Sequence, residues 1–246
     1  MIAHYNFNNV NMNSSIAADC SGFGHHGTFI GTSATTSAAP RGEHGLYTLE
    51  GHKDYVKIEN VYLSADDISI NCWFKSGAAG GKHVMVNIDN LCSLTIDQNG
   101  YIVADLVCED LTHITAASSS SIINDTWHML TLVYINEVGV NIYLDSVLVA
   151  QRLNTDKKKL LKGLKTIFIG GGPNITTDHK ETYISDVRIF SAALNINDIQ
   201  DYYKVSQSFL SNGCVLAYNF NSDISANFHF TQKGELKARD FMERSQ

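Results

Sequence analysis

A stretch near the start of the chain, Asp19 to Gly27, holds residue types that could bind a metal, act in catalysis or form a tight turn. Its sequence is DCSGFGHHG, so an acid, a thiol and two imidazoles stand among three glycines. A zinc site needs about four convergent Cys or His ligands. The sequence offers no second Cys/His cluster, so zinc is disfavoured. A tight turn is favoured, in which Gly22, Gly24 and Gly27 adopt backbone angles that other residues avoid.

The remaining polar motifs give little support for catalysis. A glycosidase needs two carboxylates that converge on one bond, but Asp66-Asp67 and Glu109-Asp110 are adjacent pairs. Adjacent residues of a strand face opposite sides of the sheet. The sequence has no Glu-x-Asp-x-x-Glu strand and no Gly-x-Ser-x-Gly motif, and the Gly170–Pro173 run lacks the Lys and Ser or Thr of a phosphate loop. We therefore predict that the protein is not an enzyme.

Composition and charge argue against several other classes of protein. The chain has 246 residues and a net charge of −7, which leaves no basic footprint for nucleic acid. No segment reaches the roughly 18 continuous apolar residues of a membrane span. The first residues, MIAHYNFNN, lack the basic and apolar regions of a secretory signal. The cysteine count is odd and contains no Cys-x-x-Cys spacing. We therefore expect no membrane insertion, and reduced cysteines in a chain made in a cytoplasm.

Short alternating segments predict an all-β protein. Residues 68–75 alternate in polarity, which is typical of a half-buried strand with Ile70, Cys72 and Phe74 facing inward. We expect four further side chains to face the same core, those of Leu130, Leu132, Ile142 and Leu144. Further strands are expected at 129–134, 140–144, 147–150, 165–169 and 183–190, and only 195–203 has helical spacing. Many short strands separated by polar turns indicate a β-sandwich or jelly roll.

Several segments, in this order, resemble the laminin-G-like, pentraxin-related branch of concanavalin A-like jelly rolls. The turn at 19–27 is similar to the family's Asp-Ser-Ser-Gly-Asn-Gly-Asn-His-Gly turn. The segments at 70–75, 126–134, 142–145 and 184–190 resemble the family's strands, and 196–203 resembles its closing helix. The likeness covers about residues 2–204. It implies one concanavalin A-like jelly-roll β-sandwich with one short helix, which we place at residues 1–206, followed by a C-terminal tail at 207–246.

The resemblance also implies a structural calcium ion. In related jelly rolls such an ion can sit where the first turn meets the last long strand. Here it would use the carboxylates of Asp19 and Asp186 and carbonyl oxygens near Gly22 and Gly24, because calcium prefers oxygen ligands. Phe23 and His25 stand where the family commonly has asparagine, which removes two oxygen ligands. A calcium site and a purely structural turn stay open as alternatives.

A binding role follows from the same resemblance, since the family binds glycans or protein surfaces. Exposed aromatic rings would stack on sugar rings. The sequence offers four candidates, which are Tyr47, Tyr55, Trp73 and His52. For each of them, ordinary packing is the alternative.

The end of the chain repeats its beginning. The segment CVLAYNFN at 214–221 echoes MIAHYNFN at 1–8, but the residues that follow are too few for a second sandwich. The segment 228–243 predicts a strand, a Lys-Gly turn and a second strand or short helix, and it resembles the ends of phage and viral fibre-like proteins. A lone hairpin is marginal in water, so we expect the tail to pack against a partner chain. The residues expected in that interface are Phe220, Phe228, Phe230, Leu236 and Phe241. Packing of the tail on its own domain is the alternative.

Two functional hypotheses result. The first is a virion structural or attachment protein, a fibre or decoration subunit made in the host cytoplasm. Its partners would be other virion subunits or its own copies through the tail, together with a cell-surface glycan. The alternative is a free-standing, cytoplasmic, carbohydrate-binding lectin.

Overall fold

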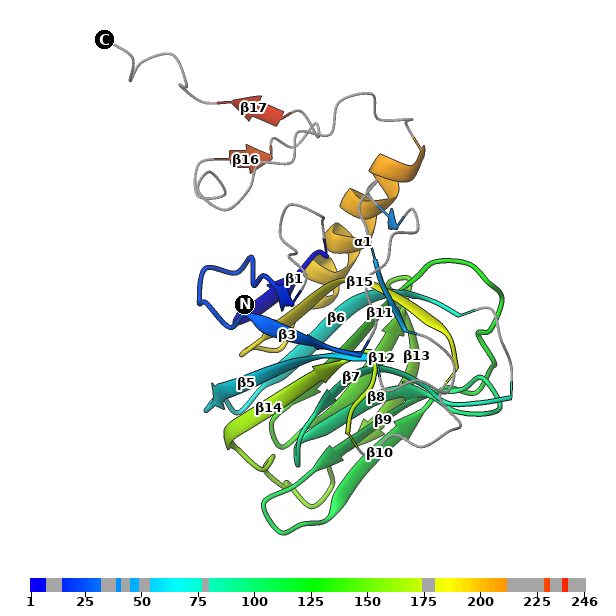
Figure 1. Cartoon of the computed structure of the whole chain (residues 1–246). Helices are drawn as coiled ribbons and strands as arrows, with labels where there is room; N and C mark the ends of the chain where they lie inside the picture. Colours follow the sequence, from blue (N-terminus) through cyan, green and yellow to red (C-terminus); the bar gives the residue numbers. More distant parts are fainter. Residues whose placement is uncertain are drawn as a thin grey trace. The chain divides into compact units, whose positions relative to one another are not determined.

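The computed structural model describes residues 1–7, 15–31, 39–40, 45–48, 54–76, 80–173, 180–211, 228–230 and 236–238. The chain divides into two compact units, Met1–Cys214 and Val215–Gln246. Within the described part of the first unit, two antiparallel sheets face each other and a helix follows the last strand (Figure 1).

Seven strands form one sheet, in the order β1-β15-β6-β11-β12-β13, with β4 paired to β15. They are β1 (Ala3–Tyr5), β4 (Leu46–Thr48), β6 (Ile68–Lys75), β11 (His128–Ile135), β12 (Gly139–Leu144), β13 (Val147–Leu153) and β15 (Thr182–Phe190). Because β15 pairs with β1, β4 and β6, it is the strand on which this sheet is assembled.

Eight strands form the second sheet, in the order β10-β9-β8-β7-β14-β5-β3-β2. They are β2 (Ile16–Ala17), β3 (Gly27–Ile30), β5 (Tyr55–Leu63), β7 (His83–Ile88), β8 (Cys92–Ile96), β9 (Ile102–Val107), β10 (His113–Ala117) and β14 (Gly163–Ile169). The predicted all-β jelly-roll sandwich is therefore confirmed.

The core between the sheets is built from the residues that the alternation predicted. On β6, Ile70, Cys72 and Phe74 are fully buried, and Leu132 on β11 lies opposite Ile70 and Ile142. Leu130 is also fully buried, whereas Leu144 is half-buried and packs against the same core. The period of two therefore assigned the inward face correctly.

The outer face of the seven-stranded sheet corrects one expectation. The alternation predicted a half-buried β6, but Trp73 on its outer face is also fully buried. The helix α1 (Ile196–Ser211) covers this face, so that Ile199 joins Trp73, Met129 and Val133 in a second apolar cluster. Its Tyr203 ring stacks on Trp73 with centroids 5.9 Å apart. The strand is buried on both sides because a helix has been added to the sandwich.

The helix begins at a capping box. The Asn195 side chain accepts hydrogen bonds from the N–H groups of Asn197 and Asp198, at 2.9 and 3.0 Å. The Asp198 carboxylate accepts the Asn195 N–H in return, at 3.2 Å. The helix runs to Ser211, beyond the predicted end at 203 and beyond the boundary placed at residue 206.

Two tight turns join the strands that carry the outer cluster. Gly139 closes the β11–β12 turn at φ 144°, and a β-carbon there would lie 2.2 Å from the Arg152 carbonyl oxygen, so this position requires glycine. The two-residue β12–β13 turn has Asp145 and Ser146 at φ 51° and 66°. Positive φ at both positions matches the twist of the flanking strands.

The second unit contains a short hairpin, which is described here by itself. Strands β16 (Phe228–Phe230) and β17 (Leu236–Ala238) pair antiparallel, with Phe230 opposite Leu236. This agrees with the two strands expected there, and the expected Lys-Gly turn lies outside the described residues. Phe220 and Phe241 lie outside the described residues.

Two chemical features of the fold bear on function. In the described part of the chain, no helix has the length and hydropathy that crossing a bilayer requires. Cys20, Cys72, Cys92 and Cys108 are free thiols, and burial raises the pKa of Cys72 and of Cys92 to about 12. Thiols with so high a pKa are poor nucleophiles at neutral pH.

Truncation of the central core leucine tests the placement of β11. Leu132→Ala should lower the free energy of unfolding by about 2–5 kcal/mol, because it leaves a cavity between the sheets. Denaturant titration measures the change. The matched control is Leu153→Ala on β13, whose side chain is 59% exposed, and it should cost under about 1 kcal/mol. Equal costs for the two variants would contradict this core.

Candidate functional site

The carboxylate of Asp19 organises the turn that the sequence singled out. Its Oδ1 accepts the backbone N–H groups of His4 and Ser21, both at 2.9 Å. Its Oδ2 accepts the Ser21 hydroxyl at 2.7 Å and the His25 N–H at 3.0 Å. Hydrogen bonds to an ionised acceptor are among the stronger ones in proteins. Asp19 therefore joins the turn to strand β1.

The glycines of this turn serve two different purposes. Gly22 and Gly24 have φ of 89° and 77°, so the predicted unusual backbone angles occur there. Gly27 instead begins β3, and a β-carbon there would lie 2.4 Å from the Val56 side chain. Glycine is therefore needed at position 27 because the chain packs closely there, and not because of the unusual backbone angle that was expected.

The second predicted carboxylate, Asp186, is almost completely buried in a bulge of β15. The register of β15 against β6 shifts between Ser185 and Arg188, and Asp186 has φ of 52°. Its Oδ1 lies 2.7 Å from His4 Nε2, and its Oδ2 lies 2.5 Å from the Arg188 guanidinium. His4 thus contacts Asp186 with its ring and Asp19 with its backbone, so one residue connects both acids.

This arrangement does not fit the expected calcium site. Calcium needs free carboxylate and carbonyl oxygens, but the four carboxylate oxygens of Asp19 and Asp186 already face hydrogen-bond donors or cations. Among the described residues, no group of three or more His, Cys, Asp or Glu side chains is arranged to hold a metal. A calcium ion bound by Asp19, Asp186 and the Gly22 and Gly24 carbonyl oxygens stays a prediction. Its binding would require the two carboxylates to give up the hydrogen bonds and ion pairs described above.

The four predicted sugar-stacking residues have different positions. Trp73 is fully buried under α1, and Tyr55 is only 8% exposed. Neither ring can reach a sugar in this structure, so both are packing residues here. His52 lies outside the described residues. Tyr47 on β4 is half-buried and reaches the surface.

Tyr47 belongs to a cluster of three half-buried aromatic rings, Tyr47, Trp127 and Tyr183, which we call the aromatic shelf. Tyr47 and Tyr183 lie opposite each other on β4 and β15 and stack with centroids 4.7 Å apart. Trp127, just before β11, meets Tyr183 edge-on at 6.5 Å. These positions bring together residues from three distant parts of the sequence.

Charged groups border the aromatic shelf. The Glu181 carboxylate accepts the hydroxyls of Tyr47 and Tyr183, at 3.1 and 3.3 Å. Partial burial and this carboxylate raise the pKa of Tyr47 to about 12, and they also raise the pKa of Tyr183. Lys75 places its ammonium 4.7 Å from the centre of the Tyr183 ring and pairs with Asp125 at 3.1 Å. The shelf thus combines aromatic surface with fixed donors and acceptors.

Trp127 is held by the turn that precedes β11. The Asn124 side chain accepts the Thr126 N–H and hydroxyl, at 3.1 and 2.7 Å, which closes the turn. Behind the ring, Gly45 allows close approach, since a β-carbon there would lie 3.2 Å from the Trp127 ring. Trp127 also packs against the apolar cluster under α1.

His128, the first residue of β11, has neighbours that resemble those of a catalytic base, but its hydrogen bonds are structural. Its ring lies 3.0 Å from the Thr126 hydroxyl and 2.6 Å from the Asp145 carboxylate, an order also used in nucleophilic catalysis. The Thr126 hydroxyl is closer to Asn124, and the other oxygen of Asp145 accepts the Met129 N–H at 2.8 Å. These bonds fasten the turn before β11 to the β12–β13 turn and so fix the position of Trp127.

Sequence reasoning found one member of the shelf and missed two. The alternation of β15 places Tyr183 on the outer face, opposite Lys75 on β6, so a signal for Tyr183 was present. Trp127 lies just before β11, so the alternation of a strand could not assign it to a face. Only the folded structure shows that it contacts Tyr183.

Comparison with known proteins gives one family and a set of related folds. A family model described as the concanavalin A-like lectin/glucanases superfamily matches residues 50–200, more than half of the chain. No curated protein matches the sequence.

Among solved structures, the fold is similar to receptor-binding domains of botulinum neurotoxins. The serotype D ligand binding domain in complex with N-acetylneuraminic acid is 18% identical, with a TM-score of 0.67, covering 83% of this chain and 50% of that one. The binding domain of neurotoxin DC in complex with SialylT is 16% identical, with a TM-score of 0.68 and coverages of 84% and 51%. The serotype G binding domain is 15% identical, with a TM-score of 0.65 and the same coverages. The chain spans about half the length of these domains, and the likeness establishes the fold alone.

Removal of the Asp19 carboxylate tests the turn. Asp19→Ala should lower the free energy of unfolding by about 2–4 kcal/mol, because its donors lose a charged, nearly buried acceptor. Asp97→Ala is the matched control, since Asp97 accepts only the N–H groups of Asn99 and Tyr101 in an exposed turn, and it should cost about 1 kcal/mol or less. Thermal or denaturant unfolding measures both. Calorimetric titration with calcium completes the experiment: heat in the wild type that disappears in Asp19→Ala would establish a calcium site, and no heat in either protein would leave the turn purely structural.

Proposed function

This chain belongs to the concanavalin A-like lectin/glucanase superfamily, and we propose that its jelly roll is a non-catalytic module that binds a glycan through the aromatic shelf. The observation that carries this proposal is the grouping of Tyr47, Trp127 and Tyr183 at the surface of the seven-stranded sheet. Aromatic rings offer apolar faces to the C–H groups of a pyranose, and neighbouring carboxylate and ammonium groups can bond its hydroxyls.

The geometry of the shelf supports recognition rather than turnover. Each charged group beside the rings already has a partner: Glu181 bonds two tyrosine hydroxyls, and Asp125 pairs with Lys75. Groups locked in this way are suited to orient a ligand, whereas a general acid must hold a proton beside the scissile bond. The family also contains glucanases, so the absence of turnover is part of the proposal.

The structural neighbours give this proposal its ligand class. Two of the neurotoxin domains were crystallised with N-acetylneuraminic acid or SialylT. Those ligands belong to those proteins, which are under 20% identical and of whose length this chain covers only about half. They support a glycan as the class of ligand to test on this chain.

Truncation of the shelf should abolish glycan binding without unfolding the protein. We expect Tyr47→Ala and Trp127→Ala each to weaken binding at least about tenfold, because a central aromatic contact commonly contributes more than 1 kcal/mol. A glycan array identifies the ligand, and calorimetry on that ligand measures the affinities.

Tyr101→Ala serves as the control, because this 37% exposed tyrosine lies before β9 and outside the shelf. It should bind like the wild type. If no glycan on the array binds, the proposal is wrong. If a glycan binds all three variants with unchanged affinity, the binding site lies on another surface.

A second, more specific proposal concerns the role of the C-terminal tail in assembly. We propose that residues 215–246 dock the jelly roll onto another subunit, as expected of a virion attachment or structural protein made in a host cytoplasm. The hairpin of β16 and β17 supports this, because two three-residue strands are too short for independent stability and need a partner. A free-standing cytoplasmic lectin is the alternative.

Deletion of residues 215–246 tests the docking role while leaving α1 whole. We expect the shortened chain to lose its oligomeric mass, or its incorporation into a particle, with a Tm close to that of the full chain. Native mass spectrometry and a melting curve on the same samples provide both readouts. A much lower Tm at unchanged mass would assign the tail to the core of its own domain, and the virion form of the proposal would lose its main support.

A further inference from the structure

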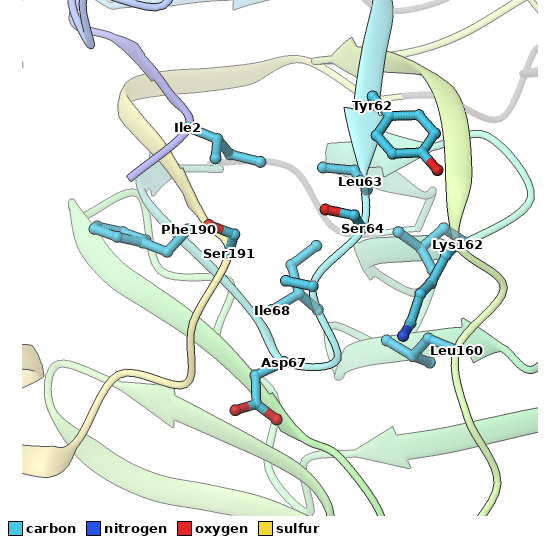
Figure 2. Close-up of a pocket in the computed structure, with 12 residues that line it drawn as sticks. Ile2, Tyr62, Leu63, Ser64, Asp67, Ile68, Leu160, Lys162, Phe190 and Ser191 are labelled. Atoms are coloured by element: carbon cyan, nitrogen blue, oxygen red, sulfur yellow. The ribbon is translucent and has the colours of Figure 1, made fainter.

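A cavity of about 110 Å³ opens at one end of the sandwich, where the β5–β6 connection crosses from one sheet to the other (Figure 2). Its inner wall is apolar and comes from both sheets. Leu63, Ile68, Leu91, Leu160 and Phe190 line it, each no more than 7% exposed. Protein interiors are close-packed, so an apolar space of this size leaves room for a small molecule.

The mouth of the cavity is polar. Ser64 and Ser191 line it and are both exposed, and Figure 2 shows their side chains on opposite sides of the space. Lys162 also lines the rim and forms an ion pair with Asp66. The Asp67 carboxylate lines the cavity as well, and it accepts the Asn136 N–H at 2.8 Å. An apolar wall with hydroxyl groups at the entrance matches a ligand that has an apolar body and one polar end.

The volume limits the size of that ligand. A dry apolar cavity of about 150 Å³ accommodates a benzene molecule, so about 110 Å³ suits a body of about four or five carbons. A sterol or an acyl chain would not fit.

The charges at the rim favour a free small molecule over a docked protein. The Asp66 and Lys162 side chains are 56% and 32% exposed. A flat partner surface seated on this end would take the ion pair out of water, which is costly. A small molecule would leave the pair solvated.

We propose that this cavity binds a short, branched, uncharged molecule with one hydroxyl or carbonyl group, independently of the aromatic shelf. The apolar body fills the space between Leu63, Leu160 and Phe190, and the polar group meets Ser64 and Ser191.

The probe is isobutanol, followed by methyl NMR on the full chain. We expect saturable shifts of the Leu63, Ile68 and Leu160 methyl groups, with a Kd in the millimolar range that so few atoms permit. Ala65→Leu, which places a larger side chain in the lining, should weaken binding at least about tenfold. Ala192→Leu is the matched control, because Ala192 is exposed and outside the lining, and it should bind like the wild type.

A second variant protects the test against a folding defect in the first. Leu160→Ala enlarges the cavity and should shift preference from isobutanol toward benzyl alcohol. Shifts that do not saturate, or that persist unchanged in Ala65→Leu, would overturn the proposal. A concentration-dependent dimer that Ala65→Leu abolishes would also overturn it, since a second copy would then be the occupant.

Discussion

A buried carboxylate on β15 is the interaction on which the seven-stranded sheet depends. Asp186 is 1% exposed, and a charge in such a position must be paired. The bulge that holds it turns its oxygens toward His4 on β1 and Arg188 on β15. Arg188 in turn reaches the Asn71 side chain on β6 at 3.4 Å and lies against the Tyr202 ring of α1. One acid thereby links the first strand, the centre of the sheet and the closing helix, and His4 extends the link to Asp19 and the opening turn.

This network explains why the outer face of the sheet has two parts. Beneath α1, polar groups such as Asn71, Thr131 and Arg188 are paired with one another, and apolar groups such as Trp73 are covered. Beyond this region, along β15 and β4, the face carries the aromatic shelf. Trp127 belongs to both, because it packs on the covered cluster and meets Tyr183 of the shelf. Packing on the covered cluster positions Trp127 in the shelf, and a preformed surface loses less entropy when it binds.

The shelf and the apolar cavity lie at opposite ends of β6. Lys75 at one end of the strand borders the shelf, and Ile68 at the other end lines the cavity. Eight residues of extended chain separate them by about 23 Å. A ligand at one site therefore has no steric contact with a ligand at the other. The two sites also differ in character, since the shelf presents rings and charged groups at the surface, whereas the cavity has an apolar inner wall behind a polar mouth.

The sequence by itself determined the fold class, the strand β6 and the strands from β11 to β15, and the inward face of the core, because a period of two is a local property that burial imposes on every sandwich strand. It also identified Tyr47, Asp19 and Asp186 as residues worth attention. It did not determine that α1 buries Trp73, because a helix packed on a sheet leaves no mark in the strand it covers. Nor did it indicate that Trp127 would meet Tyr183, or that His4 would connect the two acids. The Trp127–Tyr183 and His4–Asp186 contacts join residues 56 and 182 positions apart, and only strand pairing and the bulge in β15 decided them.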